Sequence, residues 1–221
     1  MNIIITPEIT SVAPSIKVIK IEADVTNAET SDHLWDELLN EGKRIRSLYQ
    51  LPDINKRAGI AGTRAAYKAL GKEPNRYRPS SEALCRRLVK GMELYRTLSV
   101  IDVINLISVR SGYSIGGFDA DKISGETLHL GAGREGEEFN AIGRGLLNIA
   151  HLPIYRDDIG GIGTPTSDEE RTKLSPYTTH LLMCVNIYAE ELPIQETIDL
   201  SIDLLTRHCN STNISINIIE P

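Results

Sequence analysis

The sequence predicts an α+β fold, with helices gathered in its first half and short strands in its second. Between Thr30 and Val109, apolar residues recur at helical intervals in four separate stretches. After Gly112, glycines separate short runs that are rich in β-branched residues. Strands and helices do not alternate regularly, so a doubly wound parallel sheet is disfavoured and α+β is favoured.

The first predicted element is a strand over residues 15–25, because its β-branched residues stand in near alternation. A bulge is expected after Ile19. A helix follows from about Thr30 to Tyr49, where apolar residues repeat with the period of a helix. Pro52 is expected to end this helix.

Three more helices are predicted over residues 60–70, 80–91 and 99–109. Gly71 and Gly91 stand where the first two should stop, since glycine readily adopts the left-handed backbone of a helix end. Ser80 or Ser81 is expected to cap the second of them.

The second half of the chain predicts loops and short strands, then a helix and a strand. Glycine- and aspartate-rich loops are expected at 114–126 and 160–172, and Ser167 is expected to cap a helical turn that reaches Leu174. Strands are expected at 127–130, 153–156, 178–189 and 213–219, with an amphipathic helix at 194–209.

The composition is that of a soluble globular protein. The 221 residues are 41% hydrophobic and 24% charged. No apolar run approaches the roughly 20 residues of a membrane span, and the N-terminus has no signal-peptide pattern. We therefore expect no membrane partner and one domain over residues 1–221; the oligomeric state stays open.

Three scattered cysteines form no CxxC pair and no Cys/His cluster with metal-ligand spacing. We expect no metal site, no cofactor and no disulfide framework. Free thiols fit a reducing compartment, which predicts a cytoplasmic protein.

The net charge of −6 hides a basic segment in the middle of the chain. Residues 43–96 carry 14 basic and 4 acidic side chains, whereas the flanking segments are acidic. This basic helical segment has the charge of a surface that binds a polyanion. The alternative is that its charges are the solvated faces of helices.

Two glycine-rich stretches, IGGF at 115–118 and GGIGT at 160–164, would let backbone N–H groups approach a ligand. Neither matches the phosphate-binding P-loop pattern. The glycines of LGAGREG at 130–136 come near a dinucleotide fingerprint, but no apolar helix follows them. They are better explained as turn glycines.

Acidic and hydroxyl residues lie close to these stretches. Asp119 and Asp121 follow the first, and Asp157 and Asp158 precede the second; paired carboxylates can perform acid–base work or brace a loop. TPTSDEERT at 164–172 offers hydroxyls and an arginine to a polar ligand, or forms an ordinary helix entry. The histidines are dispersed and no nucleophile motif accompanies them, so a hydrolase triad has little support.

Three stretches carry a family resemblance: EPNRYRPSSEALCRRLVKG at 73–91, VIDVINLISVRSGYSIGGFDADKISGETLHL at 100–130, and SDEERTKLSPYTTHLLMCV at 167–185. Together they resemble freestanding relatives of the tRNA-editing module, the third and fourth domains, of the phenylalanyl-tRNA synthetase β subunit. The middle stretch resembles that module's VDxTN helix, G-x-P-x-H-x-F-D loop and DADKL-like strand entry. The matching residues here are Val100 or Ile101, Asp102, Asn105, Gly112, Phe118, Asp119, Asp121 and Lys122.

The resemblance implies a β-rich sandwich backed by helices, with a ligand pocket in a region spanning residues 97–190. The synthetase module hydrolyses wrongly charged aminoacyl-tRNA, using a positioned water and the terminal ribose of the tRNA. This chain departs from it at Ser114 and Gly116, where the synthetase loop carries Pro and His, and at Met183, where its editing glutamate is expected. No aminoacylation core fits in 221 residues, so the chain is not expected to be a tRNA ligase.

On this basis we expect an editing hydrolase that acts in trans on the aminoacylated 3′ end of a tRNA. Asp119 and Asp157 are the predicted catalytic residues. The predicted substrate-binding residues are Ser114, Gly116, Gly117, Thr164, Thr166, Ser167 and Arg171. The predicted RNA-binding residues are Arg76, Arg78, Arg86 and Arg87. The alternatives are a non-catalytic RNA-binding module and a small-molecule or amino-acid binding protein.

Overall fold

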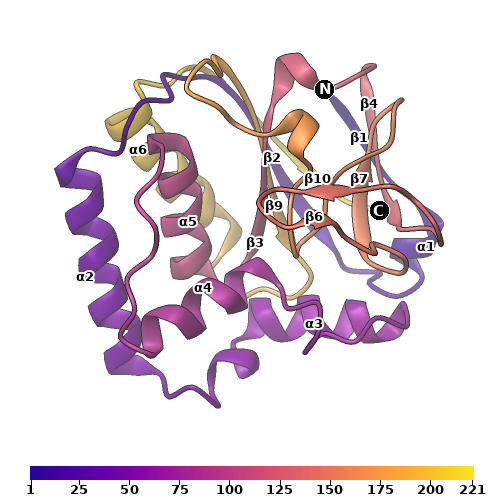
Figure 1. The fold of residues 1–221 in the computed structure, drawn as a ribbon, viewed down its shortest axis with the longest axis horizontal. Helices are drawn as coiled ribbons and strands as arrows, with labels where there is room; N and C mark the ends of the chain where they lie inside the picture. The colour runs from indigo at the N-terminus through magenta and orange to yellow at the C-terminus, as the bar shows by residue number, and fades with distance from the viewer.

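The computed structural model describes residues 1–221 and has three layers: a layer of helices, a central sheet and a second sheet (Figure 1). The helices cover one face of the central sheet, and the second sheet packs on the other face. The predicted α+β class, a β-rich sandwich backed by helices, is therefore confirmed. None of the helices is both long and apolar enough to cross a membrane.

The central sheet has four antiparallel strands in the order β10-β2-β9-β3. β2 (Lys17–Asp24) and β9 (His180–Ile187) are its inner strands, and β3 (Ser114–Asp119) and β10 (Thr212–Ile219) are its edges. β2 pairs with β9 without interruption, so the bulge predicted after Ile19 is wrong. The irregularity lies in β10, between Thr212 and Ser215.

The second sheet has the order β1-β4-β7-β8. Its strands are β1 (Asn2–Ile5), β4 (Thr127–Ala132), β7 (Pro153–Arg156) and β8 (Gly161–Gly163), and β1 runs parallel to β4. The short helix α1 (Pro7–Thr10) follows β1, and β5 (Asn140–Ala141) and β6 (Gly145–Leu146) form a separate hairpin. The sequence predicted β4 and β7 but not β1, β5, β6 or β8, which are short and carry no clear alternation.

Five longer helices match the predicted ones closely. They are α2 (Asp32–Leu48), α3 (Ala58–Ala69), α4 (Ser80–Val89), α5 (Ser99–Ser111) and α6 (Ile194–Cys209), and single 3₁₀ turns lie at Ile54–Lys56, Ala120–Lys122 and Glu170–Thr172. Gly71, Gly91 and Gly112 have positive φ angles just beyond α3, α4 and α5.

Two predicted caps differ from the structure. Pro79, not Ser80 or Ser81, is the N-cap of α4, and the N–H of Ser80 donates to the Pro165 carbonyl at 2.7 Å. Glu169, not Ser167, caps the 3₁₀ turn that follows it. The distant Pro165 carbonyl thus binds the first N–H of α4, and the neighbouring Glu169 side chain caps the 3₁₀ turn, where serine caps were expected.

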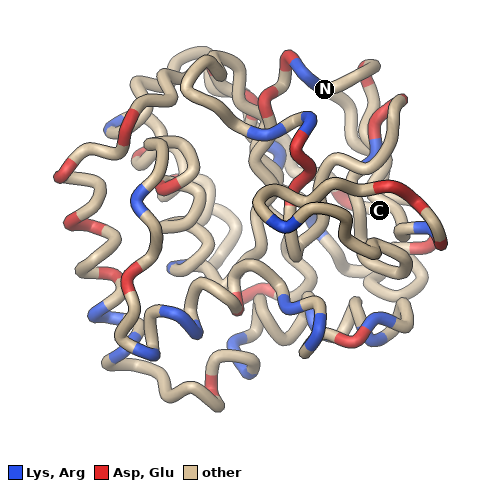
Figure 2. Tube along the Cα trace, viewed as in Figure 1, with Lys and Arg blue, Asp and Glu red and all other residues tan.

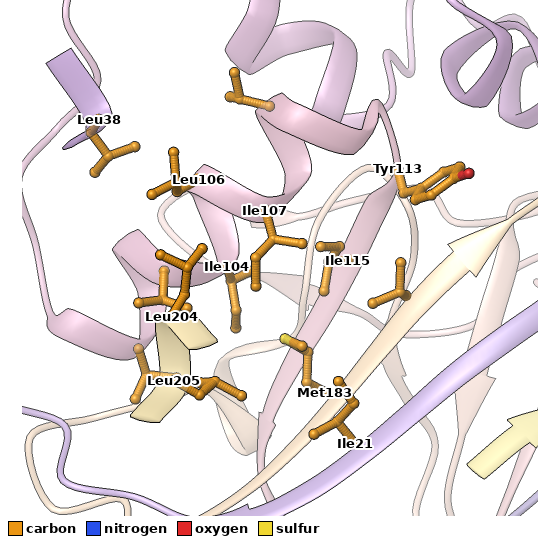
Figure 3. Close-up of a cluster of buried hydrophobic side chains, with 14 of the residues drawn as sticks. Ile21, Leu38, Ile104, Leu106, Ile107, Tyr113, Ile115, Met183, Leu204 and Leu205 are labelled. Carbon is orange, nitrogen blue, oxygen red and sulfur yellow. The ribbon is translucent and has the colours of Figure 1, made fainter. Parts of the chain in front are cut away.

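The alternation of side chains along the central strands divides the core into two main parts. Ile21, Ile115 and Met183 face the helices, where they pack with Ile104, Leu204 and Leu205 (Figure 3). Val18, Phe118 and Leu182 face the second sheet. Because both faces of β2, β9 and β3 are covered, these strands are apolar on both sides, and this explains why their alternation in the sequence is imperfect.

Residues 114–119 form a strand, so the loop predicted there is wrong. A Cβ at Gly116 would lie 2.7 Å from the Phe118 ring, and one at Gly117 would lie 2.4 Å from the Ile104 Cδ1 atom. These glycines allow close packing on each face of β3. β8 likewise occupies Gly161–Gly163 inside the second predicted loop, where a Cβ at Gly161 would lie 2.3 Å from Ile154.

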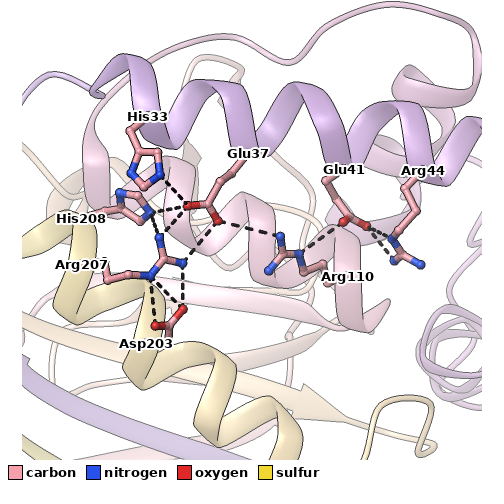
Figure 4. A network of polar contacts seen from close by, with 8 residues as sticks. All are labelled: His33, Glu37, Glu41, Arg44, Arg110, Asp203, Arg207 and His208. Atoms are coloured by element: carbon pink, nitrogen blue, oxygen red, sulfur yellow. Dashed lines mark hydrogen bonds and ion pairs between the residues drawn. The ribbon is translucent and has the colours of Figure 1, made fainter.

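A polar network joins α2, α5 and α6 at the surface (Figure 4). Arg207 donates to both Glu37 and Asp203, and Arg110 contacts Glu37 and Glu41. His33, Glu37 and His208 lie close enough to share a metal ion. Arg207 Nη1 is 2.9 Å from His208 Nε2, however, and its guanidinium occupies the position of a cation beside Glu37. The cluster is therefore explained as an ion-pair network.

Candidate functional site

A cavity of about 240 Å³ lies where α4, α5, β3 and the segment after β8 meet. Half of its lining residues are apolar, and the lining comes from five parts of the chain, because Ile142 of the β5–β6 hairpin adds to these four. The lining consists of Ser80, Leu84, Ile101, Ile104, Asn105, Ser108, Ile115, Gly117, Ile142, Asp168, Lys173 and Leu174. Such a mixture of apolar walls and a few polar groups is typical of a small-molecule site.

Asp168 is the one carboxylate in the cavity wall. Its Oδ2 accepts a hydrogen bond from the N–H of Gly117 at 3.3 Å, and no cation lies within ion-pair distance of it. Its Oδ1 is close to the backbone of Gly163, where a Cβ would lie 2.6 Å away. Burial raises the pKa of Asp168 to about 7, against the Gly117 hydrogen bond, which lowers it.

The exposed fraction of Asp168 is intermediate, although its carboxyl group is surrounded closely enough to raise its pKa. A carboxyl group that has a pKa near neutrality, belongs to a residue of a cavity wall and forms no salt bridge is the kind of group that serves as a general base.

A basic groove of about 540 Å³ adjoins the cavity and shares Ser80, Leu84 and Asn105 with it. The groove contains five cationic side chains and no carboxylate: Arg78, Arg86, Arg87, Lys90 and Arg144. Four of them come from α4 and its flanks, where basic residues follow one another (Figure 2). The fifth, Arg144, comes from the β5–β6 hairpin. In a protein of net charge −6, such a groove is a local attractor for an anion.

The positive charge of the groove is only partly neutralised. The buried carboxylate of Glu82 is 2.7 Å from Arg64, 3.3 Å from Arg78 and 3.8 Å from Arg86, so one negative charge serves three guanidinium groups. Arg87 donates to the Glu93 carbonyl instead of a carboxylate. Lys90 and Arg144 are exposed and form no ion pair. The groove therefore keeps a net positive charge that a bound polyanion would neutralise.

The two predicted catalytic residues lie outside the cavity lining. Asp157 accepts from both Nη atoms of Arg171 at 2.9 Å and from the backbone N–H groups of Ser124, Ile159 and Gly160. Burial opposes its ionisation, but these donors outweigh burial and lower the pKa of Asp157. Its ionised carboxylate braces two loops.

Asp119 is buried at the end of β3. Its Oδ2 accepts from the Thr178 hydroxyl and pairs with Lys122, each at 2.9 Å. A catalytic role for Asp119 or Asp157 stays a prediction, and the geometry favours a structural role for both.

Of the predicted substrate-binding residues, Gly117 lines the cavity and Thr166 lines the groove. Ser114 contacts the Ser81 hydroxyl at 3.1 Å, and Gly116 packs on Phe118. Thr164 accepts from the N–H groups of Thr166 and Ser167, which shapes the turn between β8 and Asp168. Arg171 is held by Asp157. The other predicted substrate-binding residues therefore hold the backbone around the cavity in place, and their direct contact with a ligand stays a prediction.

Of the predicted RNA-binding residues, Arg78, Arg86 and Arg87 line the groove. Arg76 lies outside its lining, with its guanidinium 5.5 Å from the centre of the Tyr77 ring. The structure adds Lys90 and Arg144, which the sequence did not single out. Arg144 is distant in sequence from α4, so only the tertiary fold brings it to the same groove.

The sequence did not single out Asp168 as a site residue, and it gave Asn105 only as a match to the family helix. Asp168 belongs to SDEERT, where it stands among four charged residues, and nothing in the local pattern separates it from its neighbours. Asn105 matched the family helix, but its position at the junction of cavity and groove depends on how α5 packs. Met183, at the place of the family's glutamate, is a buried core residue on the helix side of β9.

The model of the B3/4 domain matches residues 62–207, about two thirds of the chain, including α4, α5, β3 and Asp168. The chain belongs to the B3/4 domain family. Among solved structures, an N-terminal fragment of the phenylalanyl-tRNA synthetase β subunit from Pyrococcus horikoshii is 12% identical, with a TM-score of 0.47. That match covers 100% of this chain and 54% of the fragment, so the chain spans about half of the fragment's length. No curated protein matches this B3/4 domain protein in sequence.

Proposed function

We propose that this B3/4 domain protein is an editing hydrolase that removes a wrongly attached amino acid from a tRNA in trans. The observation that carries the proposal is the junction of the cavity and the groove: a carboxylate with a pKa of about 7 in a small cavity next to five unneutralised or partly neutralised cations. The groove would hold the RNA end and the cavity would hold the aminoacyl group.

Asp168 would act as the general base. In its ionised form it accepts a proton from a water molecule in the cavity, and the water oxygen attacks the carbonyl carbon of the ester. The bond between that carbon and the ribose oxygen then breaks. The ribose oxygen takes up a proton, which releases the free amino acid and a tRNA with a free hydroxyl. A base with a pKa near the working pH combines a large ionised fraction with sufficient basicity.

Asn105 would bind the ester carbonyl oxygen as negative charge develops on it. Its side chain is held at the junction, where its Nδ2 donates to Asp102 Oδ1 at 3.4 Å. Asp102 is itself fixed by Thr30 and Thr97 through bonds of 2.6 and 2.9 Å. The second N–H of the Asn105 amide has no protein acceptor and is available to a ligand.

The test is a deacylation screen in which the protein is mixed with correctly and incorrectly charged tRNAs. We expect faster ester hydrolysis for at least one mischarged species. Asp168→Asn should lower that rate about 100-fold, which is within the usual range for losing a general base. Asp121→Asn is the matched control, because Asp121 is exposed and lies outside the cavity. No acceleration for any charged tRNA would contradict the proposal.

The runner-up function is RNA binding without catalysis. It is favoured by one observation, namely that Gly116 and Met183 pack in the core and supply no chemical group at the family's expected positions. A binding assay on the same tRNAs, added to the screen, separates the two functions. Binding of tRNA with no ester hydrolysis would support the non-catalytic module, whereas binding of free amino acids without any effect of RNA would support a small-molecule binding protein.

A further inference from the structure

An exposed aromatic ring stands in the basic groove. Tyr95 lies in the segment between α4 and α5 and is 71% exposed. The guanidinium of Arg87 lies over one face of its ring, 4.2 Å from the ring centre. Since Arg87 covers only one face and most of the residue stays exposed, the other face is open to solvent.

The position of Arg87 is fixed independently of Tyr95. Its Nε donates to the Glu93 carbonyl at 2.6 Å, which ties the end of α4 to the segment that carries Tyr95. The stacked pair is therefore prearranged before any ligand binds. A planar ring backed by a guanidinium is a favourable surface for a nucleobase, because every base has a π face.

The surroundings of the pair suit a nucleic acid strand better than a folded protein. Lys90 and Arg144 are exposed in the same groove and have no carboxylate partner. They are available to phosphate groups on the strand that carries the base. The groove leads through Ser80 and Asn105 into the cavity of Asp168.

We propose that Tyr95, backed by Arg87, is the stacking site for one nucleobase of a single-stranded RNA 3′ end, and that Lys90 and Arg144 bind its phosphates. This inference rests on the proposed function, because it assumes that the RNA end reaches the cavity through the groove. It adds the residues that recognise the RNA itself: one base by stacking, with little selection among bases, and the backbone by charge.

Binding can be measured without any hydrolysis. The probe is an uncharged, 5′-fluorescein-labelled single-stranded RNA of about 8 nucleotides that ends in CCA, and the readout is fluorescence anisotropy. Tyr95→Ala should raise the Kd about tenfold, the scale expected for loss of one base–aromatic stack. Tyr95→Phe should keep the wild-type Kd. Tyr177→Ala is the matched control, since Tyr177 is 90% exposed and does not line the groove.

A second set of probes, with the base removed at one of the three terminal nucleotides, tests stacking directly. If Tyr95 stacks on a given base, the loss of affinity from removing both the base and the ring should equal the loss from removing either one. The two effects will then not add at that position. Additive losses at all three positions, or an unchanged Kd for Tyr95→Ala, would overturn the proposal. Circular dichroism of the Tyr95→Ala variant checks that the fold is intact.

The outcomes also distinguish this inference from the proposed function. Stacking at Tyr95 in a protein that hydrolyses no ester would leave the RNA site standing and contradict the hydrolase. Ester hydrolysis by a protein whose Kd for RNA and kcat/KM are unaffected by Tyr95→Ala would leave the hydrolase standing and overturn the stacking site. A Kd unchanged by Lys90→Glu and Arg144→Glu together would overturn the assignment of the phosphates.

Discussion

Asp168 shows how a single residue acquires its chemistry from its surroundings. It is one of several acidic residues in SDEERT, but it alone belongs to the cavity lining, and its carboxyl receives only one weak donor, the N–H of Gly117. Glu169 and Glu170, its neighbours, bind the Arg171 backbone and Lys173 respectively. Asp168 is therefore the buried carboxyl whose loss of hydration is not offset by hydrogen bonds or cations, and its pKa rises to about 7.

This pKa predicts a stability that depends on pH in a defined direction. The pKa of Asp168 is raised on folding from about 4 to about 7, so its contribution to the free energy of unfolding becomes less favourable as pH rises through that window. Asp168→Asn removes the ionisation. We expect the variant to match the wild type near pH 4 and to be more stable above pH 7, on the order of 1–2 kcal/mol after allowance for solvent in the cavity.

Urea denaturation at a series of pH values measures this difference. If Asp168 is a functional residue, the same variant should gain stability and lose hydrolytic activity, which is the trade-off typical of an active site. A variant that is less stable than the wild type at pH 8 would contradict the raised pKa. The rate of ester hydrolysis by the wild type should rise with pH through about 7, because the ionised base is the active form.

Gly117 allows a second prediction at the residue scale. A Cβ there would lie 2.4 Å from Ile104 Cδ1 and 3.3 Å from Leu174 Cδ1, both of which belong to cavity residues. We expect Gly117→Ala to push these tips into the cavity, to lower stability by about 1–3 kcal/mol and to weaken substrate binding. Thermal denaturation and KM measure the two effects. Gly160→Ala is the control, because nothing lies within 4 Å of its Cβ; equal effects from both variants would argue against a packing cause.

At the scale of elements, the site depends on the contacts that hold the start of α3 against the end of α5. Arg57, just before α3, donates to Glu191 at 2.7 Å and to the carbonyls of Val109 and Arg110 at 2.8 and 3.1 Å. It thereby satisfies carbonyl groups at the C-terminal end of α5, which would otherwise lack partners. α5 supplies Ile104 and Asn105 to the cavity, so Arg57 fixes the helix that forms one wall.

Arg57→Ala should therefore be strongly destabilising. Its side chain is almost fully buried, and its removal takes the cation away from the Glu191 carboxylate, which keeps only the Gly59 N–H, and a donor away from two carbonyls. We expect a loss of about 3–5 kcal/mol in the free energy of unfolding, as for breaking a buried ion pair. Arg44→Ala is the matched control, because Arg44 is itself half exposed and its partner Glu41 would keep the ion pair with Arg110, so the loss should be less than about 1 kcal/mol. Chemical denaturation that shows equal costs for the two would contradict this assignment.

At the scale of the whole molecule, the charges are separated. The protein carries −6 overall, yet the groove beside the cavity presents cations from α4 and from the β5–β6 hairpin. The basic segment at 43–96 does not all face the groove, because Arg57 and Arg64 are buried in ion pairs and only its residues between Arg78 and Tyr95 line it. Charge counting along the chain therefore overestimated the area of the basic surface and missed Arg144.

This layout predicts RNA binding that weakens with salt. If about three of the groove cations contact phosphates, log Kd should rise with log salt concentration with a slope of about 2 for a single strand. Fluorescence anisotropy from about 50 to 200 mM salt should then show a loss of affinity of roughly 15-fold. Arg144→Glu should flatten the slope, whereas Lys68→Glu, on the exposed face of α3 outside the groove, should not. Binding that is independent of salt would contradict an electrostatic groove.

The sequence by itself determined the helices, the α+β class and the positions of the longer strands. These follow from local periodicity and from stop signals such as Gly71, Gly91 and Gly112, which act through neighbouring residues. It also placed Arg78, Arg86 and Arg87 on one helix or its approach, because residues close in sequence stay close in space.

Only the tertiary structure decided which of the predicted residues line the cavity and the groove, and which other residues join them. Gly116 and Gly117 were predicted to be loop residues but form a strand. Glycine is needed there because any Cβ would clash with the Phe118 ring or with Ile104, and the Ile104 contact exists only in the folded chain. The choice of Asp168 over Asp119 and Asp157 depends on which carboxylates find donors, and folding brings Thr178 to Asp119 and Arg171 to Asp157. Burial and partner contacts are long-range properties of the fold, and local sequence patterns do not encode them.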